Sequence, residues 1–207
     1  RCADVTGVQT CALPICHLKS VKDGCSQGAC GTCTVVVDGK TVKSCVQTAD
    51  KFEGKHILTV EGLSDYEKQV YVYAFSTAGA VQCGFCTPGM VMCAKALLDR
   101  NPSPNKVEIA AAIRGNYCRC TGYKKIVEAI QMAAEILRGE KKLPSVNTNN
   151  KMGESYRRID AEEKILGTGE YCDDVEIEGM VYASPVRSRY PRARILSIDT
   201  TAAMALD

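Results

Sequence analysis

Eight of the thirteen cysteines fall into two sets of four whose spacing suits a thiolate-bound metal centre. The first set reads C-x4-C-x2-C followed by one more cysteine, and the second reads C-x2-C followed later by C-x-C. The first set is Cys25, Cys30, Cys33 and Cys45, and the second is Cys83, Cys86, Cys118 and Cys120. The first spacing is typical of a plant-type [2Fe–2S] site. The two sets together predict one-electron redox chemistry.

Zinc and disulfides are the alternative uses of these thiols. Structural zinc favours two C-x2-C pairs far apart, which the first set does not provide. The second set is less specific, and on its own it leaves zinc open. A secreted disulfide scaffold is disfavoured because the chain is long, has helical apolar patterning and carries its cysteines at ligand spacings. We therefore expect two metal centres, and we take Cys93 as a core residue and Cys172 as a buried or incidental thiol.

The loop around the first set is rich in small residues. Glycines such as Gly24, Gly28 and Gly31 allow positive φ angles and a close approach of the backbone to a bound group. Successive N–H groups of such a loop can point inward and attract an anion. Because a cluster with four thiolates is anionic, inward N–H groups would stabilise it and raise its reduction potential.

Composition limits the partners and the compartment. The 207-residue chain has a formal net charge of +2, which does not indicate a nucleic-acid partner. No run of about 18 apolar residues is present, so no membrane span is expected. A thiolate–metal protein of this kind fits a reducing cytoplasm.

The elements that must position the thiols differ between the two sets. Residues 34–37 and 40–46 predict a β-hairpin around an Asp38-Gly39 turn, with Cys45 on the return strand, and residues 56–60 predict another strand. Residues 65–80, a segment from Thr87, residues 103–115 and residues 121–139 predict four helices that form a bundle.

Helix start signals place the second set. Thr87 followed by Pro88 is typical of a helix start, Ser103-Pro104 repeats the signal, and Thr121 is a candidate cap of the last helix. Cys86 and Cys120 directly precede two of these caps. We therefore expect both thiolate pairs at helix N-termini, where the helix dipole favours an anionic cluster.

The chain divides into five predicted segments. Residues 1–16 form a non-native or disordered leader, because VTGVQTCALPI at 5–15 resembles translated sequencing adapter, and its cysteines are set aside. Residues 17–64 and 65–140 form the two cysteine domains, residues 141–164 a polar linker, and residues 165–207 a further domain with β elements near 180–182 and 195–198. The absence of a turn or cap at Asp207 predicts a truncated end.

The motifs together resemble one family. GCSQGACGTC with Cys45, QCGFCTPG and NYCRCTGY are similar to the iron–sulfur portion of molybdenum hydroxylases, the xanthine dehydrogenase and aldehyde oxidoreductase family. RIDAEEKILGTGEYCDD and GMVYASPVRSRYPRARILSID resemble the start of its hammerhead domain. The implied fold is α+β: a plant-type ferredoxin-like β-grasp domain that lacks its N-terminal part, a four-helix [2Fe–2S] bundle domain, a linker and the first β elements of a hammerhead domain.

The resemblance implies electron transfer through two [2Fe–2S] clusters, from a molybdopterin centre to FAD or an external acceptor. The cluster on Cys83, Cys86, Cys118 and Cys120 would lie nearer the pterin, and Gln82 and Cys120 become candidate pterin contacts. The molybdenum-binding domain would belong to the same full-length chain and FAD to a separate subunit, in a homo- or hetero-oligomer. No molybdenum catalytic residue is present in this segment. A free-standing ferredoxin-like carrier and a zinc-stabilised interaction module are the competing hypotheses.

Overall fold

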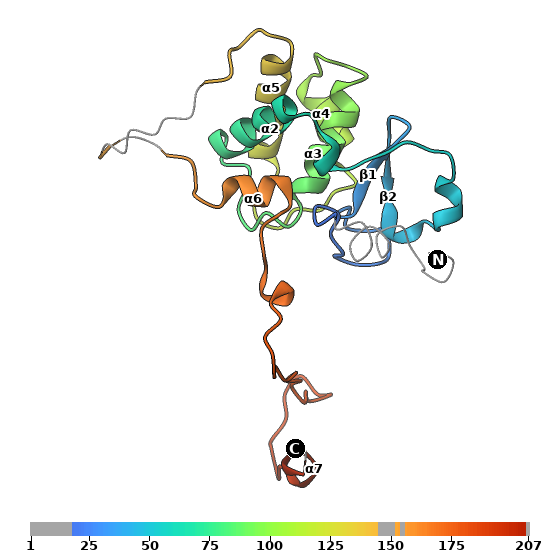
Figure 1. Cartoon of the computed structure of the whole chain (residues 1–207). Coiled ribbons are helices and arrows are strands. Elements are labelled where there is room, and N and C mark those ends of the chain that lie inside the picture. The colour runs from blue at the N-terminus through green and yellow to red at the C-terminus, as the bar shows by residue number, and fades with distance from the viewer. Residues whose placement is uncertain (1–17, 145–151, 154–155, 206–207) are drawn as a thin grey trace. The chain divides into compact units, whose positions relative to one another are not determined.

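The computed structural model describes residues 18–144, 152–153 and 156–205, and its chain divides into two units, Arg1–Gly169 and Glu170–Asp207 (Figure 1). The predicted leader and residues 145–151 and 154–155 of the predicted linker lie outside the described residues. Both cysteine sets belong to the first unit.

A small antiparallel sheet positions the first cysteine set. It consists of β1 (Thr34–Val37), β2 (Lys40–Lys43) and β3 (Ile57–Leu58), in the order β2-β1-β3. Asp38 and Gly39 have φ values of 47° and 78°, as a two-residue hairpin turn requires. The predicted hairpin is therefore confirmed, although β2 ends early and Cys45 lies in a short 3-10 turn, Ser44–Val46.

The central strand β1 is buried along its whole length because both of its faces are covered. Val35 and Val37 pack with Val21 in a small cluster, whereas Val36 joins the main core. Successive side chains of a strand point to opposite faces, so this division follows from the pleat. The strand thereby joins the small sheet to the helices.

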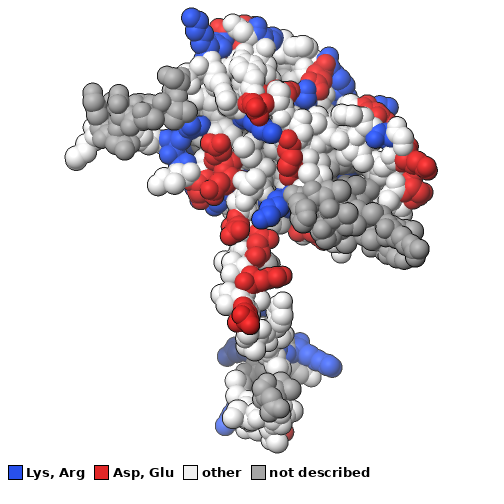
Figure 2. Space-filling view, in the orientation of Figure 1, with Lys and Arg blue, Asp and Glu red and all other residues white. Residues whose placement is uncertain are grey.

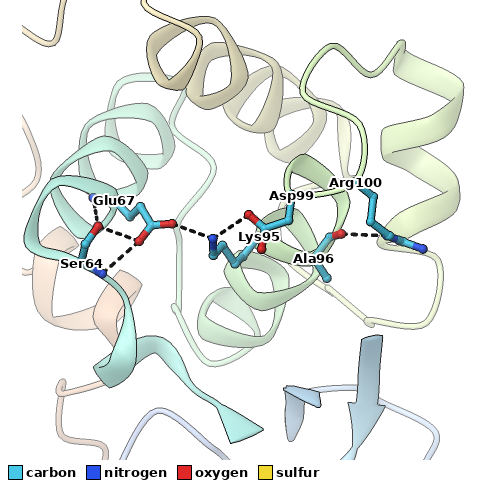
Figure 3. A network of polar contacts seen from close by, with 6 residues as sticks. All are labelled: Ser64, Glu67, Lys95, Ala96, Asp99 and Arg100. Atoms are coloured by element: carbon cyan, nitrogen blue, oxygen red, sulfur yellow. Dashed lines mark hydrogen bonds and ion pairs between the residues drawn. The ribbon is translucent and has the colours of Figure 1, made fainter. Parts of the chain in front are cut away.

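Four helices follow where the sequence predicts them. They are α2 (Asp65–Thr77), α3 (Thr87–Leu98), α4 (Lys106–Ala112) and α5 (Lys124–Leu137). The helices α2, α3 and α5 lie beside one another (Figure 1). The main apolar core runs between them, and its fully buried side chains include Phe75, Met90 and Ile130. An ionic contact from Lys95 on α3 to Glu67 on α2, at 2.8 Å, reinforces this packing, and Lys95 also contacts Asp99 at the end of its own helix (Figure 3).

Three predicted helix starts are corrected. The cap of α4 is Asn105, which forms a reciprocal capping box with Glu108, so Ser103 is not the cap. The cap of α3 is Cys86, one residue before Thr87. Thr121 does not cap α5, because Gly122 and Tyr123 follow it with positive φ values of 65° and 67° and delay the helix to Lys124.

A further helix, α6 (Ala161–Leu166), forms across the end of the segment predicted as polar linker, residues 141–164, and the start of the next predicted domain. Ala161 and Ile165 are buried and stand four residues apart, so they share the face that packs on α2 and α3. The helix ends at Gly167, whose φ of 83° is the left-handed conformation common just after helices. Two apolar residues at helical spacing were enough to dock this short segment.

The second unit has no strand over the described residues 175–200, so the β elements predicted near 180–182 and 195–198 are absent from this structure. It contains a 3-10 turn, Cys172–Asp174, and a short helix, α7 (Thr201–Met204). Val181 and Tyr182 are 84% and 91% exposed. A β pattern becomes a strand only with a hydrogen-bonding partner, and the described part of this unit offers none.

Among the described residues, no helix is both long and apolar enough to cross a membrane.

Candidate metal centres

The first four thiols converge around the loop before β1. The backbone N–H groups of Gln27 and Cys30 point at Cys25 Sγ over 3.5 and 3.4 Å, and that of Gly28 points at Cys45 Sγ over 3.3 Å. Sulfur atoms that accept several backbone N–H groups carry negative charge at lower cost. The loop therefore has the inward N–H arrangement that its small residues predict.

The titration of these thiols reflects the same contacts. Backbone N–H groups of Cys30 and Gln27 lower the pKa of Cys25 to about 6. Burial, followed by the side-chain contact with Cys33, raises the pKa of Cys45 to about 11. Cys25 therefore becomes a thiolate more readily than Cys45, whose deprotonation a bound cation would favour.

Contacts on both sides hold this loop, and close packing explains one of its glycines. A Cβ at Gly24 would lie 2.8 Å from Thr32 Oγ1 and 3.0 Å from Cys30 Sγ, so a larger residue would displace the thiol. On the other side, Lys43 Nζ donates to the carbonyl of Gly28 over 2.6 Å and pins the loop to the end of β2. The loop is thus held from both sides.

The second four thiols come from two loops far apart in sequence. One loop precedes α3 and the other lies between α4 and α5. Cys83 and Cys120 are exposed and their sulfur atoms are 3.6 Å apart. Cys86 and Cys118 are buried and contact each other. The fold of the bundle therefore brings these distant cysteines into two contacting pairs, and their binding of one common cluster stays a prediction.

Helix N-termini contribute less than predicted. Cys86 is the N-cap of α3, as the dipole argument requires, but Cys120 is separated from α5 by the turn at Gly122 and Tyr123. Hydrogen-bond donors that are close in sequence stabilise the thiolate of Cys118 instead. Burial alone would raise the pKa of Cys118, but hydrogen bonds from the Thr121 hydroxyl and backbone outweigh it and lower that pKa.

None of the eight thiols is in a disulfide, and within each set they approach one another in pairs. The described residues contain no group of three or more His, Cys, Asp or Glu side chains close enough to hold one metal ion. The contacting pairs are Cys25 with Cys30, Cys33 with Cys45, Cys86 with Cys118, and Cys83 with Cys120. Two thiolates on one tetrahedral ion with metal–sulfur bonds of about 2.3 Å lie roughly 3.8 Å apart, close to the Cys83–Cys120 distance. Each set of four therefore fits two irons that each take two thiolates.

The remaining candidates lie apart from these pairs. Gln82 has an exposed side chain, and its backbone carbonyl accepts a hydrogen bond from Arg158. Cys93 is buried in α3, as predicted, and Cys172 is exposed. His56 is exposed, and His17 lies outside the described residues.

Sequence reasoning missed two polar residues near the centres. Arg158 joins the segment before α6 to the loop that carries Cys83, through Gln82. Asn116, two residues before Cys118, is buried and contacts the first cysteine loop. Arg158 stood in a stretch without apolar periodicity, and Asn116 carried no signal beyond its place beside a ligand motif. On the face shown in Figure 2, basic and acidic side chains are interspersed over the first unit.

Comparisons with known proteins match both cysteine regions to iron–sulfur cluster binding domains. Residues 18–71 match a 2Fe-2S iron-sulfur cluster binding domain, and residues 59–131 match a [2Fe-2S] binding domain. Residues 166–207 match the a/b hammerhead domain of aldehyde oxidase and xanthine dehydrogenase. The resemblance read from the motifs is therefore confirmed.

Individual relatives agree. The chain is 50% identical over 119 residues to a nicotinate dehydrogenase small FeS subunit of Eubacterium barkeri, covering 57% of this chain and 76% of that subunit. It is 36% identical over 203 residues to an aldehyde oxidoreductase of Megalodesulfovibrio gigas, covering 91% of this chain but 22% of that enzyme. The solved aldehyde oxidoreductase of Desulfovibrio gigas superposes with a TM-score of 0.73 at 35% identity, over 81% of this chain and 20% of that one.

The chain spans only about a fifth of the aldehyde oxidoreductases, but it spans three quarters of the small FeS subunit. Its two cluster-binding regions and the hammerhead match occur in the same order as in the longer relative. The chain therefore belongs to the molybdenum hydroxylase family, of which it represents the iron–sulfur portion and the start of the hammerhead domain.

Proposed function

We propose that this chain carries electrons one at a time between two [2Fe–2S] clusters inside a molybdenum hydroxylase. The first cluster would be held by the set around the β1 loop, with Cys25 and Cys30 on one iron and Cys33 and Cys45 on the other. The second would be held by Cys83 with Cys120 and by Cys86 with Cys118. The fold would then be a ferredoxin-like β-grasp domain followed by a four-helix cluster-binding domain.

The observation that carries this proposal is the pairwise approach of eight thiols outside disulfides, in two separate places. A zinc site would bring four ligands to one ion, whereas a two-iron cluster needs two thiolates on each iron. The N–H groups aimed at Cys25 and Cys45 add to this, because donors to sulfur stabilise an anionic cluster.

The two centres would differ in reduction potential. The first receives three backbone N–H contacts on its sulfur atoms, at Cys25 and Cys45. The second has a buried pair and an exposed pair, so its charge is partly solvated. Hydrogen bonds to sulfur and solvent exposure are two of the terms that set such potentials. A difference between the two reduction potentials would favour electron flow from the centre of lower potential to the centre of higher potential.

The relatives suggest where the electrons come from and go to. We infer that the second centre lies nearer a molybdopterin centre and that Gln82 and Cys120, both exposed, face it. The first centre would pass electrons to FAD on a separate subunit or to an external acceptor. The molybdenum-binding part would follow the hammerhead segment in the same chain, and the complete enzyme would be an oligomer in the cytoplasm. The substrate class is left open because it depends on residues of that other part.

Metal analysis of the whole chain tests the proposal. Anaerobic loading with ferrous salt and sulfide should give four irons and four acid-labile sulfides per chain, as two clusters require, and two distinct electron paramagnetic resonance signals after reduction. About two zinc ions per chain, without iron or labile sulfide, would identify a zinc module instead.

A free-standing electron carrier is the second candidate, and the hammerhead match over residues 166–207 argues against it. The reading frame beyond Asp207 distinguishes the two. A stop codon shortly after it would favour the carrier, and a continuing molybdenum-binding sequence would favour the hydroxylase.

A further inference from the structure

Asn116 lies at the junction of the two cysteine loops. Its side chain is on the second loop, yet its partners belong to the first loop, to β1 and to α3. Nδ2 donates to the Gly31 carbonyl over 3.1 Å, and Oδ1 accepts from Cys93 Sγ over 3.3 Å. Oδ1 also lies 3.3 Å from the Thr34 hydroxyl, whose single proton it shares with the nearer Gly31 carbonyl. The residue is 3% exposed. One buried amide therefore joins three separate elements with both of its ends.

The backbones at this junction approach so closely that only glycine fits. A Cβ at Gly31 would lie 2.5 Å from the Gly115 carbonyl oxygen and 2.7 Å from Asn116 Oδ1. A Cβ at Gly89, on α3, would lie 2.7 Å from the Gly31 oxygen and 2.9 Å from Asn116 Nδ2. The two loops and α3 are therefore in direct contact, with no space for the loops to shift toward one another.

A backbone hydrogen bond crosses the same junction. The N–H of Tyr117 donates to the carbonyl of Cys30 over 2.7 Å. Tyr117 directly follows Asn116 and directly precedes Cys118, so this bond joins residues at or beside proposed ligands of both clusters. A displacement of Asn116 would move the bond and change the spacing of the two centres.

The Asn116 amide matters for the position of the two loops, because the Gly31 carbonyl that it contacts has other hydrogen-bond donors. The Gly31 carbonyl also accepts from the Thr34 N–H over 3.1 Å and from the Thr34 hydroxyl over 2.7 Å. If the Asn116 donor were lost, this carbonyl would keep two partners and no buried acceptor would be left unpaired. The lost contact is the one that ties the second loop to the first.

We propose that Asn116 is a positioning residue for electron transfer between the two centres: its buried amide fixes the separation and orientation of the two cysteine loops. This inference rests on the proposed function. The side chain contacts Gly31, Thr34 and Cys93 rather than the proposed ligands, so it acts through the backbone that carries them. Electron tunnelling falls steeply with separation, and a small displacement of one loop would slow it.

Two variants disturb the junction in different ways. Asn116→Asp keeps the size of the side chain but sets a carboxylate oxygen against the Gly31 carbonyl. Gly89→Ala keeps the amide and inserts a methyl group between α3 and the loops. In the whole chain loaded anaerobically with iron and sulfide, both should retain two clusters. Both should weaken the spin–spin splitting between the reduced clusters and slow electron transfer between them severalfold after a reducing flash.

Two controls keep the junction intact. Cys93→Ser retains a donor toward Asn116 Oδ1, and Ile109→Val removes a methyl group from a fully buried site in α4, so it lowers stability without touching the loops. Both should keep the parent splitting. The splitting therefore separates a change of position from a general loss of stability.

The outcomes separate a failure of the positioning role of Asn116 from a failure of the proposed electron-transfer function. A parent chain that loads no pair of clusters refutes the proposed function. A parent that loads both, with Asn116→Asp and Gly89→Ala showing unchanged splitting, overturns the positioning role alone. If a variant loads less iron, hydrogen exchange at the Tyr117 amide decides without metal. Faster exchange in Asn116→Asp than in Ile109→Val supports the role, and equal exchange overturns it.

Discussion

The two cysteine sites are built in different ways. The first is local: its thiols lie on one loop and on the turn after β2, and backbone N–H groups of that loop point at Cys25 and Cys45. The second is assembled from two loops that only the helices bring together, and its members divide into a buried pair and an exposed pair. The first site should depend on loop conformation and the second on the packing of the bundle.

The largest effect is expected when one proposed buried ligand is removed, in two separate variants, one for each site. Cys33→Ser should abolish the signal of the first cluster and leave the second, and Cys86→Ser should do the reverse, because a neutral hydroxyl does not replace a thiolate on iron. The measurement is electron paramagnetic resonance of the reduced chain, with iron content. Loss of both signals from either variant would show that the two sites do not form independently.

A smaller effect is expected from the first loop's backbone. Gly31→Ala should lower the free energy of unfolding by roughly 3 kcal/mol, from about 1–2 for a positive φ and a similar amount for overpacking. Gly39→Ala, with φ of 78° and nothing within 4 Å of its Cβ, is the matched control. It should cost about 1 kcal/mol in urea unfolding. Equal costs would mean that contact with Gly115 contributes nothing.

The bundle can be weakened at the contact between α2 and α3. Partial burial alone would raise the pKa of Glu67, but hydrogen bonds from Lys95 and Ser64 outweigh it and lower that pKa (Figure 3). A lowered pKa stabilises the fold above the ordinary value of 4.5 and loses this effect as pH falls through the folded value. Glu67→Gln should therefore cost about 1 kcal/mol at pH 7, with the difference fading under acid.

Iron retention gives the same variant a second readout. If the second site depends on the bundle, Glu67→Gln should release the second cluster to a chelator sooner than the parent, with the first cluster unaffected. Glu128→Gln, at an exposed position of α5, is the control and should match the parent. If the first cluster were released earlier than the second, the first site rather than the second would depend on the packing of the bundle.

The smallest effects concern two tyrosines. Tyr71 is fully buried and its hydroxyl has no partner among the described residues, whereas the Tyr123 hydroxyl accepts the Cys118 N–H over 2.8 Å. Tyr71→Phe should be neutral or stabilising by up to about 1 kcal/mol, and Tyr123→Phe should cost about as much. Denaturant unfolding at pH 7, with chelator release of the second cluster, measures both.

Alkaline pH sharpens the tyrosine comparison. Burial raises the pKa of Tyr71 above its ordinary value of 10.0. The stabilisation linked to its protonated form is complete below that value and is lost as pH rises toward the folded value. Tyr71→Phe should therefore lose less stability than the parent at high pH. A parallel decline of the two proteins would contradict this burial.

Local signals predicted the parts of the fold that local physics controls. Asp38 and Gly39 formed the predicted turn because positive φ at both positions favours it. The predicted start of α5 was wrong because the Thr121 hydroxyl contacts Cys118 Sγ and accepts from the Tyr123 N–H instead of capping a helix. The predicted strands near 180–182 and 195–198 are absent because a strand needs hydrogen bonds from a partner that periodicity does not supply.

The cysteine spacing by itself predicted two thiolate sites and the residues proposed for each, because ligand geometry limits the short gaps between thiols. Only the tertiary structure decided which thiols pair, which pair is exposed and how the two loops meet. Those features depend on contacts between distant segments, such as Asn116 with Gly31 and α6 with α3, whose partners are chosen by packing of the whole unit.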